Sequence, residues 1–274
     1  MSGDLRRHAI GVFDSGVGGL TVLRALRERL PGERFVYLGD TARLPYGTKS
    51  RETVVRYSLQ CAARLVERDI KALVVACNTA SAVALEALRE RFAPLPVIGV
   101  VEPGARAAVA ATRSGSIAVI ATEGTVQGGA YQRAISQLRF EVRIVARACP
   151  LFVALAEEGW TEGAIVESIA HRYLDDIFLP GAGRPDTLVL GCTHFPVLKD
   201  ALAGVVGDDV RIVDSALTTA EAVHELLLAR GLETDEPVAR LEMLATDGAQ
   251  RFARVGGVFA GAPLRAGDVE IVDL

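Results

Sequence analysis

The sequence predicts an α/β fold made of two similar, doubly wound domains, each with a parallel sheet. Short apolar runs that end in glycine or a small polar residue alternate with helical patterns along nearly the whole chain. Composition agrees, because 50% of the residues are hydrophobic and only 5% are aromatic, as in helices packed on a parallel sheet. A chain of 274 residues favours about two domains.

The first half begins with a strand, a turn and a helix. Residues 9–13 form an apolar run, residues 14–19 a glycine-rich turn, and residues 20–30 a helical pattern that Pro31 and Gly32 end. The other elements expected in this half are a strand at 34–38, a polar loop at 39–48, a helix at about 50–68, a strand at 73–76, a helix up to residue 92 and a short strand at 97–101.

The second half repeats this alternation. We place the crossover at Glu102-Pro103-Gly104, where proline and glycine interrupt the pattern. The elements expected after it are an alanine-rich helix, strands at 116–121 and 140–145, helices after Cys149-Pro150 and at about 162–179, strands at 186–190 and 211–213, and a helix at 219–230. The tail, with its apolar segments 240–246 and 269–274, should pack back on the first half, because a C-terminal strand needs a sheet to join.

A weak internal duplication relates the two halves. Residues 10–16 and 117–124 both lead from an apolar strand into a glycine turn. Cys77 and Cys192 are separated by nearly the same length of chain as these two openings. We therefore expect a first domain of residues 1–101 plus 215–274 and a second domain of residues 102–214, each offering one cysteine.

Charge and hydropathy exclude several classes of protein. The net charge of −4 and the pI near 5.7 are unlike those of nucleic-acid-binding proteins. No apolar run approaches the roughly 18 residues of a membrane span. The N-terminus lacks the apolar stretch of a secretory signal, so we expect a cytoplasmic protein that binds neither nucleic acid nor membrane.

Two of the four cysteines are candidates for chemistry. No C-x-x-C pair is present, which argues against a zinc knuckle or a thioredoxin-like site, and free thiols are expected in a reducing compartment. Cys61 lies in a helical pattern and Cys149 precedes a proline, so both are expected to have packing roles. Cys77 and Cys192 differ, because each ends a strand and is followed by small polar residues.

That position suits acid–base chemistry. A thiolate is both nucleophile and base, and the N-terminus of a following helix should lower the thiol pKa below the usual value of about 8.5. Asp14 and His194 are natural general bases beside such thiols. The carboxyl ends of strands in open α/β sheets face the ligand crevice. We therefore predict that Cys77 and Cys192 face each other across one pocket.

Cofactor sites fit the sequence poorly. The turn at residues 14–19 resembles a phosphate-binding turn, but it lacks the Walker lysine and the G-x-G-x-x-G spacing. Pyridoxal phosphate needs a Schiff-base lysine, and the only lysines, Lys49, Lys71 and Lys199, do not end strands. We therefore expect a reaction without a cofactor.

Two further groups of polar residues are not assigned to chemistry by their pattern alone. Zinc held by Cys77, Cys192 and His194 would have three ligands from two distant loops and no further Cys or His, which disfavours it. By helical pattern alone, Glu157 and Glu158 belong to a solvated helix face.

Five motifs in order along the chain resemble those of the glutamate racemase family, part of the cofactor-independent aspartate/glutamate racemase superfamily. They are residues 14–21, 39–47, 76–81, 149–153 and 191–196. The resemblance implies two α/β domains related by pseudo-twofold symmetry, with the active site between them. It further implies interconversion of L- and D-glutamate, which supplies D-glutamate for peptidoglycan synthesis. Glutamate is the expected small-molecule partner, and we expect a homodimer.

The resemblance also implies roles for individual residues. Cys77 and Cys192 would be the catalytic thiols, assisted by Asp14, His194 and Glu157, with Glu158 as the adjacent alternative to Glu157. Cys77 would remove the Cα proton of D-glutamate, and Cys192 that of L-glutamate. The implied substrate-binding residues are Asp14, Ser15, Pro45, Tyr46, Gly47, Cys77, Asn78, Thr79, Thr122, Thr125, Cys192, Thr193 and His194.

Three alternatives stay open at this point. The first is a racemase for aspartate or another amino acid, although relatives that act on aspartate usually have a glutamate in place of His194. The second is a ligand-binding protein on the same fold without turnover, which the presence of both thiols disfavours. The third is a redox sensor, which the absence of a C-x-x-C pair disfavours.

Overall fold

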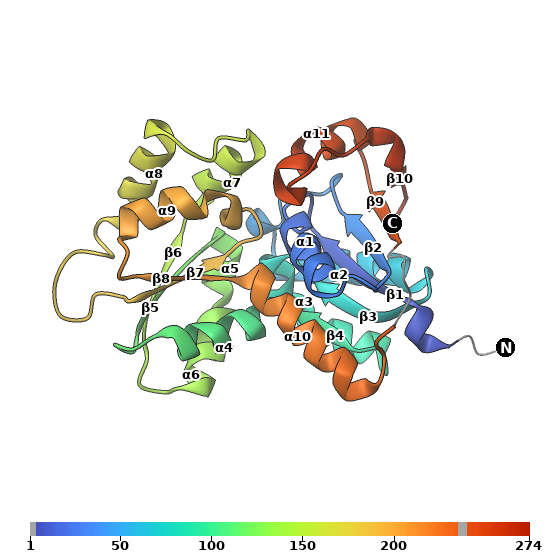
Figure 1. Ribbon diagram of the computed structural model, residues 1–274, viewed down its shortest axis with the longest axis horizontal. Helices are drawn as coiled ribbons and strands as arrows, with labels where there is room; N and C mark the ends of the chain where they lie inside the picture. Colours follow the sequence, from blue (N-terminus) through green and yellow to red (C-terminus); the bar gives the residue numbers. More distant parts are fainter. Residues whose placement is uncertain (1–3, 235–239) are drawn as a thin grey trace.

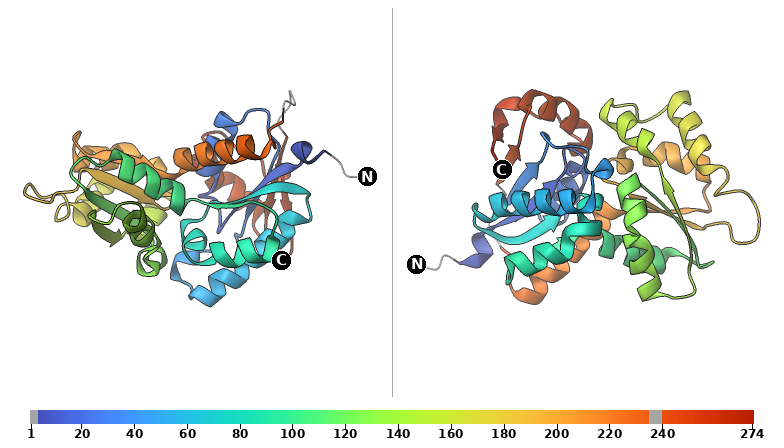
Figure 2. Two further views of the ribbon diagram at one scale, coloured as in Figure 1. Left: turned by 90° about the horizontal axis from the view of Figure 1, so that it is seen from below. Right: turned by 180° about the vertical axis from the view of Figure 1, so that it is seen from behind.

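The computed structural model describes residues 4–234 and 240–274, which form two lobes that lie side by side (Figures 1 and 2). The first lobe is built on a six-stranded sheet and the second on a four-stranded sheet. All paired strands are parallel. Each sheet is packed on both faces, because alternate side chains of its strands belong to two separate apolar clusters. The predicted fold class is confirmed.

The first lobe has β1 at the centre of its sheet. From edge to edge, the strands are β10 (Val269–Ile271), β9 (Leu241–Ala245), β2 (Phe35–Gly39), β1 (Ala9–Asp14), β3 (Ile70–Val75) and β4 (Val97–Gly99). One face packs on α1 (Leu20–Arg29), α10 (Ser215–Arg230) and α11 (Ala249–Ala260), and the other on α2 (Arg51–Val66) and α3 (Asn78–Phe92).

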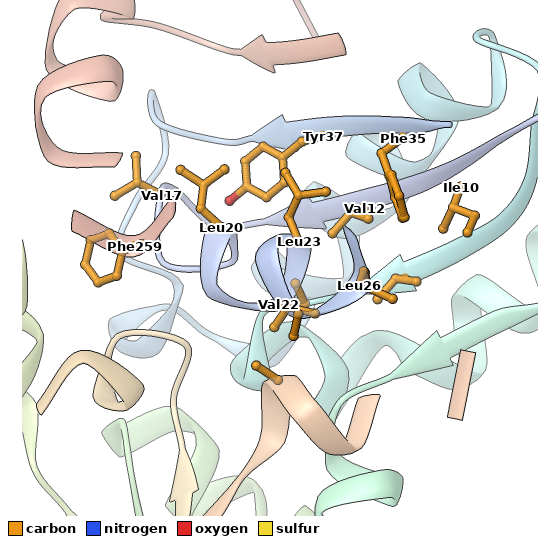
Figure 3. Close-up of a cluster of buried hydrophobic side chains, with 14 of the residues drawn as sticks. Ile10, Val12, Val17, Leu20, Val22, Leu23, Leu26, Phe35, Tyr37 and Phe259 are labelled. Atoms are coloured by element: carbon orange, nitrogen blue, oxygen red, sulfur yellow. The ribbon is translucent and has the colours of Figure 1, made fainter. Parts of the chain in front are cut away.

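Alternation along β1 decides which residues reach which face. Ile10 and Val12 point to the α1 side, where Leu23 and Phe259 belong to the same cluster (Figure 3), while Phe13 points to the α2 side. All of these side chains are at most 3% exposed. A strand buried on both faces has a continuous apolar sequence, which is why residues 9–13 were recognisable as a strand.

The second lobe has the sheet order β6 (Arg143–Ala148), β5 (Ser116–Ala121), β7 (Thr187–Gly191) and β8 (Arg211–Asp214). Its helices are α4 (Val101–Ala111), α5 (Glu123–Gly128), α6 (Ala130–Leu138), α7 (Pro150–Glu157), α8 (Ala164–Leu174) and α9 (Lys199–Val206). Short 3-10 helices are η1 (Leu5–Arg7), η2 (Tyr46–Thr48), η3 (Phe195–Leu198) and η4 (Ala266–Asp268).

The two sheets repeat one strand order. The sequence β2-β1-β3-β4 of the first lobe recurs as β6-β5-β7-β8 in the second. Cys77 follows β3 and Cys192 follows β7, so the cysteines come after equivalent strands. This shared topology agrees with the internal duplication expected from the sequence.

Some predicted boundaries are wrong. The strand expected at 97–101 ends at Gly99, and α4 begins at Val101, so Glu102-Pro103-Gly104 is no break but the first turn of a helix. Proline fits there because the first helical turn needs no backbone N–H donor. The strand expected at 140–145 instead spans Arg143–Ala148, and α5, α6, α9 and α11 were not predicted.

The tail behaves as expected. Strands β9 and β10 extend the first sheet beyond β2, and α11 packs against that sheet beside α1. Within the described part of the chain, none of the helices combines the length and the apolar character needed to cross a membrane.

A buried ion pair lies at the opposite end of the first sheet from the cysteines. Lys71, near the start of β3, places its Nζ 2.5 Å from Glu33 Oε2, and both side chains are at most 3% exposed. The same ammonium group donates hydrogen bonds to the carbonyls of Arg6 and Leu232, each at 2.7 Å. The pair therefore joins the chain before β1, the strand β3 and the segment after α10.

We expect Lys71→Met to lower the free energy of unfolding by about 3–5 kcal/mol, because it leaves the Glu33 carboxylate buried without its partner. Adding Glu33→Leu to that variant should recover part of the loss. The measurement is urea unfolding followed by circular dichroism. As a control, Arg24→Met removes the exposed pair with Glu28 and should change the free energy by less than about 0.5 kcal/mol. Equal stability of Lys71→Met and the unmodified protein would contradict this role.

Candidate active site

The predicted catalytic residues Asp14, Cys77 and Cys192 lie at the carboxyl ends of three strands. Asp14 is the last residue of β1, Cys77 directly precedes α3, and Cys192 directly follows β7. Each cysteine is 5% exposed, and Asp14 is fully buried. In sheets of this type the carboxyl ends of the strands border the ligand crevice. The three side chains therefore lie at the edge of the sheets where folds of this class bind ligands.

A glycine allows the turn after β1 to approach the Cys192 loop. A Cβ atom at Gly18 would lie 2.5 Å from Thr193 Oγ1 and from His194 Nδ1, which is closer than real contacts. Thr21 Oγ1 also donates a hydrogen bond to the Thr193 carbonyl at 3.1 Å. Only glycine fits at this position. This contact between the lobes brings Asp14 to the side of the second lobe.

Cys77 is a protonated thiol at neutral pH. Burial raises the pKa of Cys77 to about 12, and the negative charge of Asp14 acts in the same direction, against a hydrogen bond from the Ala80 N–H and the contact with Ser15. The Sγ atom lies 3.6 Å from Ser15 Oγ. Our expectation that the helix N-terminus lowers this pKa is wrong, because burial outweighs the helix N–H groups.

Cys192 is connected to a relay of charged groups. Its Sγ lies 3.8 Å from His194 Nδ1, and His194 Nε2 lies 3.2 Å from Glu157 Oε1. Arg251, on α11 of the first lobe, donates a hydrogen bond to Glu157 Oε2 at 2.8 Å. This chain of contacts therefore leads from Arg251 on the first lobe to the Cys192 thiol of the second lobe.

The relay favours a charged histidine. Burial lowers the pKa of His194, but hydrogen bonds with Cys192 and Glu157 and the charges of Cys192 and Asp14 raise it more, to about 10. The hydrogen bond from His194 lowers the pKa of Glu157 against the effect of burial, and Arg251 contributes to this. The solvated helix face expected for Glu157 is wrong, since its side chain is only 18% exposed. Glu157, and not Glu158, reaches the histidine.

Asp14 contacts both lobes. The Gly16 N–H donates to its Oδ2 at 3.0 Å, and Thr193 Oγ1 donates to its Oδ1 at 3.4 Å. Burial raises the pKa of Asp14, and the charge of His194 and these hydrogen bonds partly oppose that rise. This carboxyl group can therefore exchange protons more readily than an exposed aspartate.

Three hydroxyl groups from both lobes converge at the same edge. Thr79 Oγ1 on α3 lies 3.0 Å from Thr122 Oγ1 and 3.1 Å from Thr125 Oγ1, and the last two are 3.0 Å apart. Gly47 packs against them, because a Cβ there would lie 2.8 Å from Thr122 Cβ. Hydroxyl protons can rotate toward an incoming anion. The cluster suits a carboxylate group.

Asn78 lies beside Cys77 at the start of α3 and is 3% exposed. Its Oδ1 accepts a hydrogen bond of 2.7 Å from Tyr131 Oη, which belongs to α6 of the second lobe. Its Nδ2 is buried without a partner among the described residues. An amide donor left in this way is ready to bind an acceptor oxygen.

The loop that contains Pro45, Tyr46 and Gly47 is held by contacts with Asp40. The Tyr46 ring is buried, and its hydroxyl donates to the carboxylate of Asp40. Arg43 forms an ion pair with the same carboxylate at 2.7 Å. The Tyr46 hydroxyl is therefore engaged inside the first lobe, and Gly47 is the residue of this loop that contacts the threonine cluster.

Several residues of the site escaped the sequence reasoning. Tyr131, Arg251 and Asp40 hold Asn78, Glu157 and Tyr46, respectively. Asp40 lies within a motif that was recognised, whereas Tyr131 and Arg251 have no local pattern that marks them. Among residues 4–234 and 240–274, no group of three or more His, Cys, Asp or Glu side chains is placed to hold a metal ion.

Comparisons with known proteins agree with this geometry. A sequence model of the Asp/Glu/Hydantoin racemase family matches residues 10–223. The chain is 54% identical over 269 residues to the glutamate racemase of Geobacter metallireducens, covering 97% of both chains. Its structure resembles the glutamate racemase of Francisella tularensis in complex with D-glutamate, with a TM-score of 0.90, 34% identity and 98% coverage of both chains.

The glutamate racemase of Bacillus anthracis is similar over the same extent. Its TM-score is 0.92 at 37% identity, with 98% of both chains covered. The match therefore includes both lobes and the contact between them. The chain belongs to the Asp/Glu/hydantoin racemase family.

Proposed function

We propose that this protein is a glutamate racemase in which Cys77 and Cys192 transfer protons on opposite faces of the substrate Cα. The observation that supports this most is the pair of buried thiols after equivalent strands of two topologically matched sheets. Racemisation needs an acid and a base on opposite sides of one carbon, and a duplicated fold can supply one from each lobe. The identity to glutamate racemases supports glutamate as the substrate.

The electrostatics assign protonation states to Cys77 and to His194. At neutral pH Cys77 is protonated, because the pKa of Cys77 is raised to about 12, and so it is an acid. His194 is a cation, because the pKa of His194 is raised to about 10, and its Nδ1 lies 3.8 Å from Cys192 Sγ. With L-glutamate, Cys192 removes the Cα proton and Cys77 donates a proton to the opposite face. With D-glutamate the roles of the two thiols are reversed.

Substrate binding and carbanion stabilisation use groups that are polar but uncharged. The hydroxyls of Thr79, Thr122 and Thr125, the free amide N–H of Asn78 and the backbone N–H groups at the start of α3 are donors for carboxylate oxygens. Negative charge that develops on a carboxylate as the Cα proton leaves is stabilised by such fixed donors. No step of this proposal involves a cofactor.

We further propose that the first domain comprises residues 1–101 plus 215–274 and the second residues 102–214. The protein is proposed to form a homodimer, to be located in the cytoplasm and to supply D-glutamate for peptidoglycan synthesis. The division is supported by the sheets, whose strands all fall within the corresponding ranges.

The alternatives have less support. An aspartate racemase from Picrophilus torridus matches with a TM-score of 0.57 at 16% identity, which reflects the fold alone. A binding protein without turnover has no need for two thiols with separate hydrogen-bonding partners, as found here.

We expect Cys77→Ala and Cys192→Ala each to abolish racemisation of glutamate, because either change leaves one face of Cα without a proton donor or acceptor. The assay is loss of the circular-dichroism signal of L-glutamate, with no cofactor added. Cys149→Ala is the matched control, since this cysteine also lies between a strand and a helix, and it should retain turnover. Full activity in either of the first two variants would refute the assignment.

The pH dependence tests the relay. Glu157→Gln removes a carboxylate that helps to raise the pKa of His194, so that pKa should fall, and the imidazole should lose its charge at lower pH. We therefore expect the alkaline limb of the kcat/KM profile to move to lower pH. Glu158→Gln, one residue away, serves as the control and should leave the limb in place. Coincident profiles for the two variants and the unmodified enzyme would contradict the role of Glu157.

A further inference from the structure

We infer that Tyr131 is a positioning residue that sets the orientation of the Asn78 amide and thereby makes substrate binding depend on the contact between the lobes. The inference rests on the proposed function, in which Asn78 binds a substrate carboxylate. Tyr131 belongs to α6 of the second lobe and Asn78 to α3 of the first. Their hydrogen bond therefore crosses between the lobes at 2.7 Å.

The orientation of an amide group matters because its two ends have opposite hydrogen-bonding roles. The oxygen accepts and the nitrogen donates, so an Asn side chain turned by half a rotation would present its oxygen to the substrate carboxylate and repel it. Here Tyr131 Oη donates to Asn78 Oδ1, which leaves Nδ2 as the free end. The Ser215 side chain forms a hydrogen bond with the oxygen of the same tyrosine. The group left for Asn78 is therefore the Tyr131 proton, which favours the amide orientation that can bind an anion.

The Tyr131 ring is fixed in position by burial and close packing. Its side chain is 1% exposed, and glycines border the ring on two sides. A Cβ at Gly104 on α4 would lie 3.2 Å from Tyr131 Oη, and one at Gly191 at the end of β7 would lie 3.1 Å from Tyr131 Cε2. Burial and the charge of Cys192 raise the pKa of Tyr131, so the hydroxyl keeps its proton and remains a donor. Gly191 immediately precedes Cys192, which places the ring next to one of the proposed catalytic thiols.

The two lobes must be in contact for this hydrogen bond to exist. If they separate, Asn78 Oδ1 loses its donor and the amide is free to rotate. Contact between the lobes therefore completes the proposed binding site by fixing the Asn78 amide. This links lobe contact to substrate recognition and involves no catalytic proton transfer.

The test is a kinetic comparison of Tyr131→Phe, which keeps the ring and removes only the hydroxyl. We expect kcat/KM for glutamate to fall about 10-fold, mainly through a higher KM, because a binding donor is mispositioned. Tyr173→Phe is the matched control: this second-lobe hydroxyl accepts from the Leu151 N–H and has no contact with Asn78, so kcat/KM should be unchanged. Thermal unfolding of each variant shows whether the fold is intact.

A double-variant cycle separates positioning from a general structural effect. In an Asn78→Ala background, Tyr131→Phe should cause no further loss of kcat/KM, because the amide it orients is gone. Multiplicative losses, or unchanged kcat/KM in Tyr131→Phe alone, would overturn the inference while leaving the racemase proposal intact. Absence of glutamate turnover by the unmodified protein would overturn both.

Discussion

The close contact between the glycine turn after β1 and the loop after β7 is the constraint on which the site depends. Gly18 has no side chain, and the space that a Cβ would need is filled by Thr193 and His194. The contact joins the carboxyl ends of two separate parallel sheets, and hydrogen bonds such as Asp14–Thr193 and Thr79–Thr122 link groups of the two lobes there. A single sheet presents its strand ends in one row, whereas two sheets in contact can present groups from two sides. The proposed inversion at Cα depends on such an arrangement.

Hydrogen-bonding partners then distinguish the two equally buried thiols that follow equivalent strands. Cys77 has mainly neutral partners, such as Ser15, and burial keeps it protonated. Cys192 has a charged histidine beside it, supported by Glu157 and Arg251. The same strand–cysteine–helix arrangement therefore has two environments with different hydrogen-bonding partners.

The features that the sequence revealed are those with a local pattern. The buried strands were visible as apolar runs, and Cys77 and Cys192 stood out because each ends such a run. Residues that act through distant contacts were not visible. Tyr131 meets Asn78, and Arg251 meets Glu157, only after the two lobes assemble. The pKa of Cys77 was predicted in the wrong direction, because the degree of burial is set by the whole fold and not by the neighbouring helix.

The most direct measurement is isotope incorporation during racemisation in D2O. L-Glutamate is converted for a short time, and deuterium at Cα is measured separately in the D-glutamate formed and in the L-glutamate that remains. Transfer between two thiols predicts deuterium in the product and almost none in the remaining substrate, because the proton removed and the proton delivered are on different sulfur atoms. Product that retains the original hydrogen, or equal labelling of both enantiomers from the start, would show that one group serves both faces and would contradict the two-thiol site.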